Sequence, residues 1–220
     1  ASHVTGQLSV DVHQLIGIDV DQFYGIEIEE FPAQIAQVAM WLMDHQMNLQ
    51  VSEEFGLYFA RIPLRTSPHV VHGNALRLDW NEVLPAQRCS YVLGNPPFIG
   101  HQWRNKEQMN DMEHIWGNDG RFGRLDYVAC WHHKATDYMR DYPSITCALV
   151  STNSICQGEQ VGILWSWMLA QGVHIHFAHR TFAWSNEAKG KAAVHCVIIG
   201  FGLRNCLKKV IFEYGHVKSE

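Results

Sequence analysis

Apolar and polar residues follow two different periods along the chain, and the periods alternate. Short runs of β-branched and aromatic residues predict strands, and the stretches between them, with apolar residues every three or four positions, predict helices. The predicted strands are 23–28, 70–76, 91–95, 145–151, 173–179, 193–201 and 207–214. The predicted helices are 31–46, 124–140 and 159–172. Strands that alternate with helices predict an α/β fold with a mostly parallel sheet.

The first predicted helix begins shortly after the first predicted strand. Pro32 suits a first helical turn, and the last predicted helix is closed by Gly172. The apolar residues that recur at helical spacing in the first helix are Ile35, Val38, Ala39 and Leu42. A strand followed by a helix in this way is the first half of a βαβ unit.

Polar residues stand at three predicted strand ends: Glu27, Asn74 and Asn95. In parallel sheets, ligands bind at the carboxyl ends of the strands. An acidic residue such as Glu27 commonly accepts hydrogen bonds from ribose hydroxyls, and an amide such as Asn74 could bind an adenine edge. The structural alternatives are a solvated charge at Glu27 and a turn amide at Asn74 that satisfies its own backbone.

Residues 93–100 read LGNPPFIG, and the strand must stop there because proline has no backbone N–H. The side-chain oxygen of Asn95 and the carbonyl of Pro96 become two acceptors held close together. Two acceptors suit the adenine N6 amine, whose lone pair is otherwise delocalised into the ring. Phe98 offers a face on which a base can stack. The structural alternative is a proline turn that only ends a strand.

The NPPF sequence resembles the Asn/Asp-Pro-Pro-Tyr/Phe catalytic motif of amino-group (N6-adenine) DNA methyltransferases. Over about residues 22–203 the chain resembles the methyltransferase domain of MmeI-like (type IIG/IIL) restriction–modification enzymes. The segments that carry the resemblance are FYGIEIEEFPAQIAQVAMWL, GNALRLDW, LGNPPFIG, LDYVACW, STNSICQGEQVGILW and FAHRTFAWSNEAKGKAAVHCVIIGF. The resemblance implies a Rossmann-like class I S-adenosylmethionine-dependent methyltransferase fold.

The resemblance also implies a cofactor and the residues that bind it. S-adenosylmethionine would donate a methyl group to the N6 amine of an adenine that has left double-stranded DNA. Glu27 would bind the ribose hydroxyls of this cofactor. The other residues that would line the cofactor pocket are Ile28, Asn74, Ala75 and Asp126.

The same resemblance assigns the target base to the NPPF turn. Asn95 and the carbonyl of Pro96 would hold the target amine, and Pro97 completes the motif. Phe98 would stack on one face of the base, and Phe182 would close the other. In-line attack on the sulfonium methyl needs no metal and no covalent intermediate, so positioning and electrostatics would carry the rate.

One part of the family pattern is not found before Glu27. The family has a glycine-rich Asp-Pro-Ala-Cys-Gly-Ser-Gly motif on the preceding strand, whereas this chain has only HVTGQ and LIGID there. We therefore expect a domain that is incomplete at its N-terminus, with weak or no cofactor binding by this chain alone. Its sheet should have a gap or a rearranged centre unless residues 1–21 fill it. The expected organisation is an irregular lead-in at 1–21, a partial catalytic domain at 22–203, and a segment at 204–220 that leads toward a DNA-recognition domain.

Composition changes this picture in one respect, the mode of DNA binding. The 220 residues are 47% hydrophobic and 18% charged, which is typical of a globular protein with a real core. A net charge of −5 is not typical of a protein that grips nucleic acid by itself, so most DNA contacts are expected from domains outside this chain. Six cysteines without a CxxC pair favour reduced thiols in a bacterial cytoplasm, and no apolar stretch is long enough to span a bilayer.

The sequence also allows other functions and other roles for some residues. Motifs of the NPPY type also methylate protein glutamine or RNA, although the long match through 177–195 favours DNA. The chain could instead be a non-catalytic remnant that serves as an interaction module. Two lysines within 185–192 could touch the DNA backbone or lie in a solvated loop. His174 and His176 lie on one predicted strand face, but without a cysteine or carboxylate nearby they favour packing over metal binding.

Overall fold

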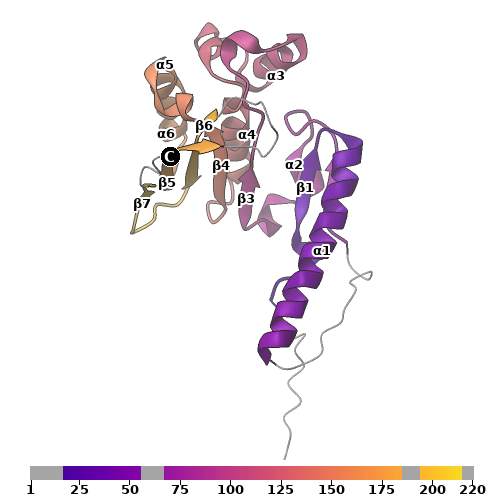
Figure 1. Cartoon of the computed structure of the whole chain (residues 1–220). Coiled ribbons are helices and arrows are strands. Elements are labelled where there is room, and N and C mark those ends of the chain that lie inside the picture. The colour runs from indigo at the N-terminus through magenta and orange to yellow at the C-terminus, as the bar shows by residue number, and fades with distance from the viewer. Residues whose placement is uncertain (1–16, 56–66, 185–193, 215–220) are drawn as a thin grey trace, which may run out of the picture. The chain divides into compact units, whose positions relative to one another are not determined.

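The computed structural model describes residues 17–55, 67–184 and 194–214 (Figure 1). The chain divides into two compact units, an N-terminal unit of Ala1–Leu78 and a C-terminal unit of Asp79–Glu220. The lysine-containing segment 185–192 lies outside the described residues, as do the first sixteen residues of the predicted lead-in.

The N-terminal unit contains a strand, a long helix and a second strand. These are β1 (Tyr24–Glu27), α1 (Glu30–Phe55) and β2 (His69–His72). The two strands pair in parallel, with Glu27 opposite His72. This arrangement confirms the predicted βαβ unit. Among the described strands, β1 and β2 pair only with each other.

Helix α1 is longer than predicted, and the apolar residues at helical spacing do not mark the face that packs on the sheet. It continues past residue 46 to Phe55, because no glycine or proline interrupts 47–55. The predicted apolar stripe is largely exposed, with 51% of Ile35 and 58% of Leu42 accessible. The helix lies against the sheet through other residues, including buried Ala33 and Gln37, whose Nε2 donates to the Val70 carbonyl over 3.3 Å. Apolar residues occur on two faces of α1, so the spacing alone could not identify the packed face.

Five strands form the sheet of the C-terminal unit. Their order is β3-β4-β6-β5-β7, as the strands follow one another across Figure 1. Their bounds are Tyr91–Gly94 for β3, Thr146–Thr152 for β4, His174–Trp184 for β5, Val194–Gly202 for β6 and Val210–Phe212 for β7. β3 pairs in parallel with β4 and β7 in parallel with β5, whereas β6 is antiparallel to both of its neighbours.

The fold is therefore α/β with a mixed sheet, and the expectation of a mostly parallel sheet is not confirmed. The connection from β5 to β6 explains the difference. It consists of residues 185–193, whereas a crossover between parallel strands takes about a dozen residues or more. Strands joined by so short a connection pair as an antiparallel hairpin.

The helices of the C-terminal unit are short, and two of them, α2 and α3, were not predicted. Helix α3 is marked by a capping box between Asn105 and Gln108 and by Gly117, whose φ is 70°. The predicted helix 159–172 consists of α5, a π-helical turn and α6, and it ends before Gly172 at φ 83°. The helix bounds are Trp80–Val83 for α2, Lys106–Trp116 for α3, Ala129–Met139 for α4, Gly158–Gln160 for α5 and Ser166–Ala170 for α6. None of the described helices is long and apolar enough to cross a membrane.

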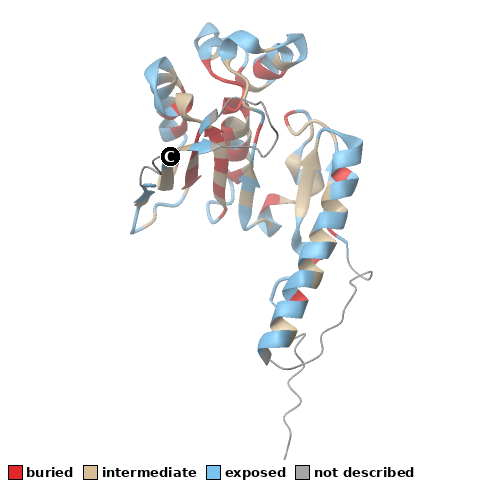
Figure 2. Ribbon diagram, in the orientation of Figure 1, coloured by how far each residue is buried: buried red, intermediate tan, exposed pale blue. Residues whose placement is uncertain are grey.

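The core of the C-terminal unit lies on one face of the sheet, where buried residues gather on β4 and α4 (Figure 2). Alternate residues of β4 and β6 point to this face because side chains alternate along a strand. The buried residues that share it are Cys147, Leu149, Ser151, Val197, Ile199 and Phe201. α4 covers this face, and its His132 stacks on Phe201 with the ring planes at 13°.

His132 is a fully buried imidazole in this core. Its Nδ1 lies 3.2 Å from the Val128 carbonyl, and its Nε2 has no hydrogen-bond partner among the described residues. The neighbouring rings are Phe201 at 5.7 Å and Trp165 at 6.1 Å between centroids. Burial in this apolar environment lowers the pKa of His132 from 6.5 to about 4, so the folded protein holds it neutral.

We predict that His132 makes the stability of the chain depend on pH. Because its folded pKa lies below its unfolded value, the unfolded state takes up the proton first as the pH falls. His132 should not lower the free energy of unfolding above pH 6.5. The free energy of unfolding should fall as the pH drops from 6.5 to 4. The drop that His132 causes should approach about 3 kcal/mol.

Urea unfolding of wild type and His132→Leu between pH 4.5 and 7.5 measures this effect. The variant should lose the part of the pH dependence that His132 causes, while His114→Leu, at an exposed position, should keep it. Parallel pH profiles for wild type and His132→Leu would contradict the prediction.

Candidate functional site

The NPPF turn begins where β3 ends. Gly94 is the last residue of β3 and lies opposite Leu149 of β4. A Cβ at this position would lie 3.0 Å from Leu149 Cδ2, so a larger residue would require the Leu149 side chain to shift. Asn95 is exposed, and its side chain makes no hydrogen bond to another described residue. Pro96 is buried and Phe98 is half-buried, so the turn is anchored while the Asn95 amide is presented to its surroundings.

The residues after the turn are tied to the segment that leads into α4. The Tyr127 N–H donates to the Ile99 carbonyl over 2.9 Å. The His101 N–H donates to Oδ1 of Asp126 over 3.0 Å. Arg104 holds the same short stretch from the other side, because its Nε donates to the His101 carbonyl over 3.2 Å. The turn is therefore followed by a stretch that is held without belonging to a strand.

Asp126 is the centre of this hydrogen-bond network, and only 5% of it is exposed. Its Oδ2 accepts from Thr152 Oγ1 over 3.2 Å and also from the Ser154 hydroxyl. Its backbone N–H donates to Oε1 of Gln160 over 3.0 Å. Since both carboxylate oxygens accept from the protein, a direct contact of Asp126 with a cofactor stays a prediction.

Phe182 lies near the carboxyl end of β5, at the same end of the sheet as Thr152 of β4. Both residues are opposite Cys196 of β6, one on each side of it. Neighbouring strands are about 4.8 Å apart, so the backbones at Thr152 and Phe182 are roughly 10 Å apart. β4 and β5 run in the same direction because each is antiparallel to β6. The structure thus brings Asn95, Phe98, Asp126 and Phe182 to the end of the five-stranded sheet at which β3, β4 and β5 finish.

The predicted cofactor residues of the N-terminal unit also meet at strand ends. Glu27 closes β1, and its carbonyl accepts from the Gly73 N–H over 2.8 Å. Glu27 and Asn74 therefore lie at the same end of the parallel pair. Ile28 is exposed, and Ala75 is half-buried beside Asn74.

The side chain of Asn74 also has a structural role. Its Oδ1 accepts from the Leu76 N–H over 2.9 Å, and its carbonyl accepts from Arg77 and Leu78. This is the turn that the structural alternative expects, formed by an asparagine that bonds to the backbone two residues ahead. A cofactor contact at Asn74 is compatible with this turn and stays a prediction.

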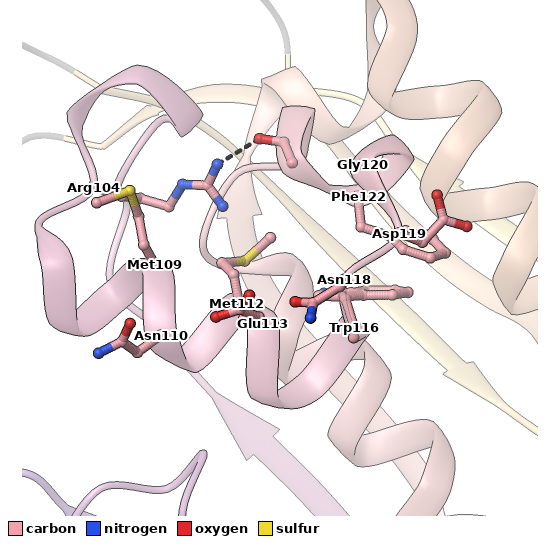
Figure 3. A pocket seen from close by; sticks show the side chains of 12 residues that line it. Arg104, Met109, Asn110, Met112, Glu113, Trp116, Asn118, Asp119, Gly120 and Phe122 are labelled. Carbon is pink, nitrogen blue, oxygen red and sulfur yellow. Dashed lines mark hydrogen bonds between the residues drawn. The ribbon is translucent and has the colours of Figure 1, made fainter.

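A cavity of about 440 Å³ lies beside the loop that follows the NPPF turn (Figure 3). It is lined by Arg104, by α3 with Met112 and Trp116, and by the loop with Phe122. The Arg104 guanidinium donates to the Gly123 carbonyl, and burial lowers its pKa. None of the residues that the sequence predicted for the site is part of the lining of this cavity. Much of the lining belongs to α3, a helix that was not predicted from the sequence.

Several residues of the site were missed at the sequence level. Thr152, Ser154 and Gln160 lie in STNSICQGEQVGILW, a segment that carried the resemblance without any role being assigned to these residues. Their hydroxyl and amide groups were the available signal. Among residues 17–55, 67–184 and 194–214, no group of three or more His, Cys, Asp or Glu residues could hold a metal ion. His176 is bonded through Nε2 to the Arg204 carbonyl at 2.8 Å.

Comparison with known proteins identifies the family. The family model described as "MmeI, DNA-methyltransferase domain" matches residues 3–213. The chain is 42% identical over 175 residues to DNA methyltransferase A of Bacillus subtilis (strain 168), a match that covers 78% of this chain and 20% of that protein. A solved structure of the type IIL restriction–modification enzyme MmeI in complex with DNA is 56% identical with a TM-score of 0.89, covering 99% of this chain and 29% of that one.

The chain thus spans less than a third of the length of either relative. The family model nevertheless covers nearly all of the chain, and the likeness to MmeI extends over its whole described fold. The chain therefore belongs to the family of MmeI DNA-methyltransferase domains.

Proposed function

We propose that this chain is the catalytic domain of a restriction–modification enzyme that transfers a methyl group from S-adenosylmethionine to the N6 amine of a flipped-out adenine in DNA. The observation that carries the proposal is the geometry of the NPPF turn. An exposed asparagine amide, without a partner among the described residues, follows the strand end, and a buried proline fixes its backbone. Phe98 stands two residues beyond that proline.

The chemistry follows from the acceptors of this turn. Asn95 Oδ1 and the Pro96 carbonyl accept the two N–H bonds of the adenine amine, which localises the nitrogen lone pair for in-line attack on the methyl. Phe98 stacks on the base, and Phe182 closes its other face. An adenine can reach this turn only after leaving the duplex, at a cost of a few kcal/mol. These residues bind and orient the base, and S-adenosylmethionine supplies the activated methyl group.

The residues proposed to bind the cofactor, apart from Asp126, lie in the N-terminal unit. Glu27 accepts hydrogen bonds from the ribose hydroxyls, while Ile28, Asn74 and Ala75 line the adenine end of S-adenosylmethionine. The parallel pairing of β1 with β2 supports this role, because it places Glu27 and Asn74 at adjacent carboxyl ends. The proposed fold is Rossmann-like and of class I, with residues 22–203 as the catalytic region and 204–220 as the start of the next segment.

Double-stranded DNA is the proposed macromolecular partner of the whole enzyme. The net charge of −5 supports the proposal that other domains of the enzyme make most of the contacts with DNA phosphates. We place the reaction in the bacterial cytoplasm, and the six free cysteines support a reducing compartment.

The role of Asn95 predicts a loss of activity without a loss of fold. Asn95→Ala in the full-length enzyme should lower methyl transfer to DNA at least a hundredfold, because one acceptor of the target amine disappears. Its melting temperature should stay within a few degrees of wild type, since the side chain is exposed and bonds to no described residue.

Transfer of tritiated methyl groups to unmethylated DNA, together with thermal melting, provides the measurement. Asn105→Ala is a matched control, because it removes an asparagine that only caps α3. Activity within a few fold of wild type for Asn95→Ala would exclude the proposed role of this side chain.

The role of Glu27 predicts a defect in cofactor binding. Hydrogen bonds to a charged group contribute about 1.5–3 kcal/mol each, so Glu27→Ala should raise the Kd for S-adenosylmethionine roughly tenfold or more. Calorimetric titration of the full-length enzyme measures this constant. Glu30→Ala, at an exposed position in the first turn of α1, should bind like wild type. Equal affinities for wild type and Glu27→Ala would remove Glu27 from the cofactor site.

A further inference from the structure

The NPPF turn needs support from beyond its own prolines. Its catalytic use depends on the position of Asn95, and a displacement of about 1 Å in a catalytic group can cost roughly a hundredfold in rate. β3 ends at Gly94, so no strand pairing holds the residues that follow. Two hydrogen bonds tie the stretch after the turn to residues 126 and 127: the Tyr127 N–H bonds to the Ile99 carbonyl, and the His101 N–H bonds to Asp126.

Asp126 is held through all of its polar atoms. Its backbone N–H donates to Gln160, and its carbonyl accepts from the Ala129 N–H over 3.0 Å at the start of α4. Its Oδ1 accepts from the His101 N–H, and its Oδ2 accepts from the Thr152 and Ser154 hydroxyls. These donors fill three of the roughly four acceptor positions of a carboxylate. A buried side chain with this many partners has little freedom to turn toward a ligand.

The two oxygens of Asp126 reach in different directions along the chain. Oδ1 holds the stretch after the NPPF turn, whereas Oδ2 holds the end of β4 and the turn after it. The Thr152 and Ser154 hydroxyls lie 2.6 Å apart and contact each other as well as the carboxylate. One side chain thus connects the irregular stretch at 99–101 with the end of a central strand.

We propose that Asp126 is a positioning residue that sets the NPPF turn for methyl transfer by tying His101 to the Thr152 and Ser154 hydroxyls. This role rests on the proposed function, and it replaces direct cofactor contact as the reason that the reaction needs this carboxylate. Hydrogen bonds to a charged acceptor are the stronger kind, which suits a group that must fix a loop. Loss of the carboxylate should therefore slow the transfer step and leave cofactor affinity nearly unchanged.

The experiment compares substitutions of Asp126 in the full-length enzyme. Asp126→Ala removes the whole network, while Asp126→Asn keeps one oxygen for the His101 N–H and offers an amide to the hydroxyls. Ser154→Ala removes a donor from the far side and leaves Asp126 in place. Asp111→Ala is the matched control, because its carboxylate is equally buried but accepts from the Tyr127 hydroxyl at 2.6 Å.

Three quantities are measured for each protein below its melting temperature. The first is the single-turnover rate of methyl transfer to unmethylated DNA at saturating S-adenosylmethionine. The second is the Kd for S-adenosylmethionine, and the third is hydrogen–deuterium exchange of the peptide that contains residues 95–104.

The proposal predicts a specific pattern across the variants. Asp126→Ala should transfer at least a hundredfold more slowly, with a Kd within threefold of wild type and faster exchange in 95–104. Asp126→Asn should recover to within about tenfold of the wild-type rate, and Ser154→Ala should lie between the two. Asp111→Ala should keep wild-type exchange in 95–104 and a rate within a few fold of wild type.

Other results would overturn the proposal. A Kd for S-adenosylmethionine that rises tenfold or more in Asp126→Ala, with the rate restored at saturation, would show direct cofactor contact. Unchanged exchange in 95–104 would show that the carboxylate does not hold the loop. An equal loss of transfer rate in Asp111→Ala would show that removal of any buried carboxylate slows the reaction. If wild type transfers no methyl group while Asp126→Ala still loosens 95–104, the proposed function fails and the bracing role stands.

Discussion

Strand β3 cannot continue past the NPPF turn, because two successive prolines supply no N–H to the β4 ladder. Pairing between β3 and β4 ends at Gly94 opposite Leu149, whereas β4 runs on to Thr152 beside β6. The last residues of β4 therefore have no β3 partner. Asp126 bonds at this end of β4, since its Oδ2 accepts from the Thr152 hydroxyl. The early end of β3 thus leaves the Asn95 amide exposed, and the loop after it is held by hydrogen bonds to Asp126 and not by strand pairing.

The prediction of elements from the sequence succeeded where a local pattern determines them. All seven predicted strands occur in the structure, and the glycine that closes the last predicted helix has the positive φ expected of it. Helix α3 was missed because its apolar residues are few, although its capping box and its closing glycine were both present in the sequence. The apolar spacing in α1 did not identify its packed face, because the choice between two apolar faces depends on which one the sheet covers.

Strand direction shows how a nonlocal property can still have a local cause. Alternation of strands and helices predicted a mostly parallel sheet, yet β6 runs antiparallel to β4 and β5. The length of the connection between β5 and β6 already contained this information. The network around Asp126 is different, because its partners stand 25 to 34 residues away along the chain. No spacing rule relates these positions, so only the folded structure could bring them together.

The reversed strand leaves the proposed site intact for a geometrical reason. β6 is antiparallel to β4 and to β5, and two reversals restore the original direction. The carboxyl ends of β3, β4 and β5 consequently lie at the same end of the sheet, where Asn95, Thr152 and Phe182 are found. The pair β1 and β2 obeys the same rule in the N-terminal unit, with Glu27 and Asn74 at its carboxyl ends. The residues proposed to bind base or cofactor lie near or just after the carboxyl ends of strands in these two sets, and β6 supplies none. The order of the site thus depends on the direction of the strands that carry it, and not on a wholly parallel sheet.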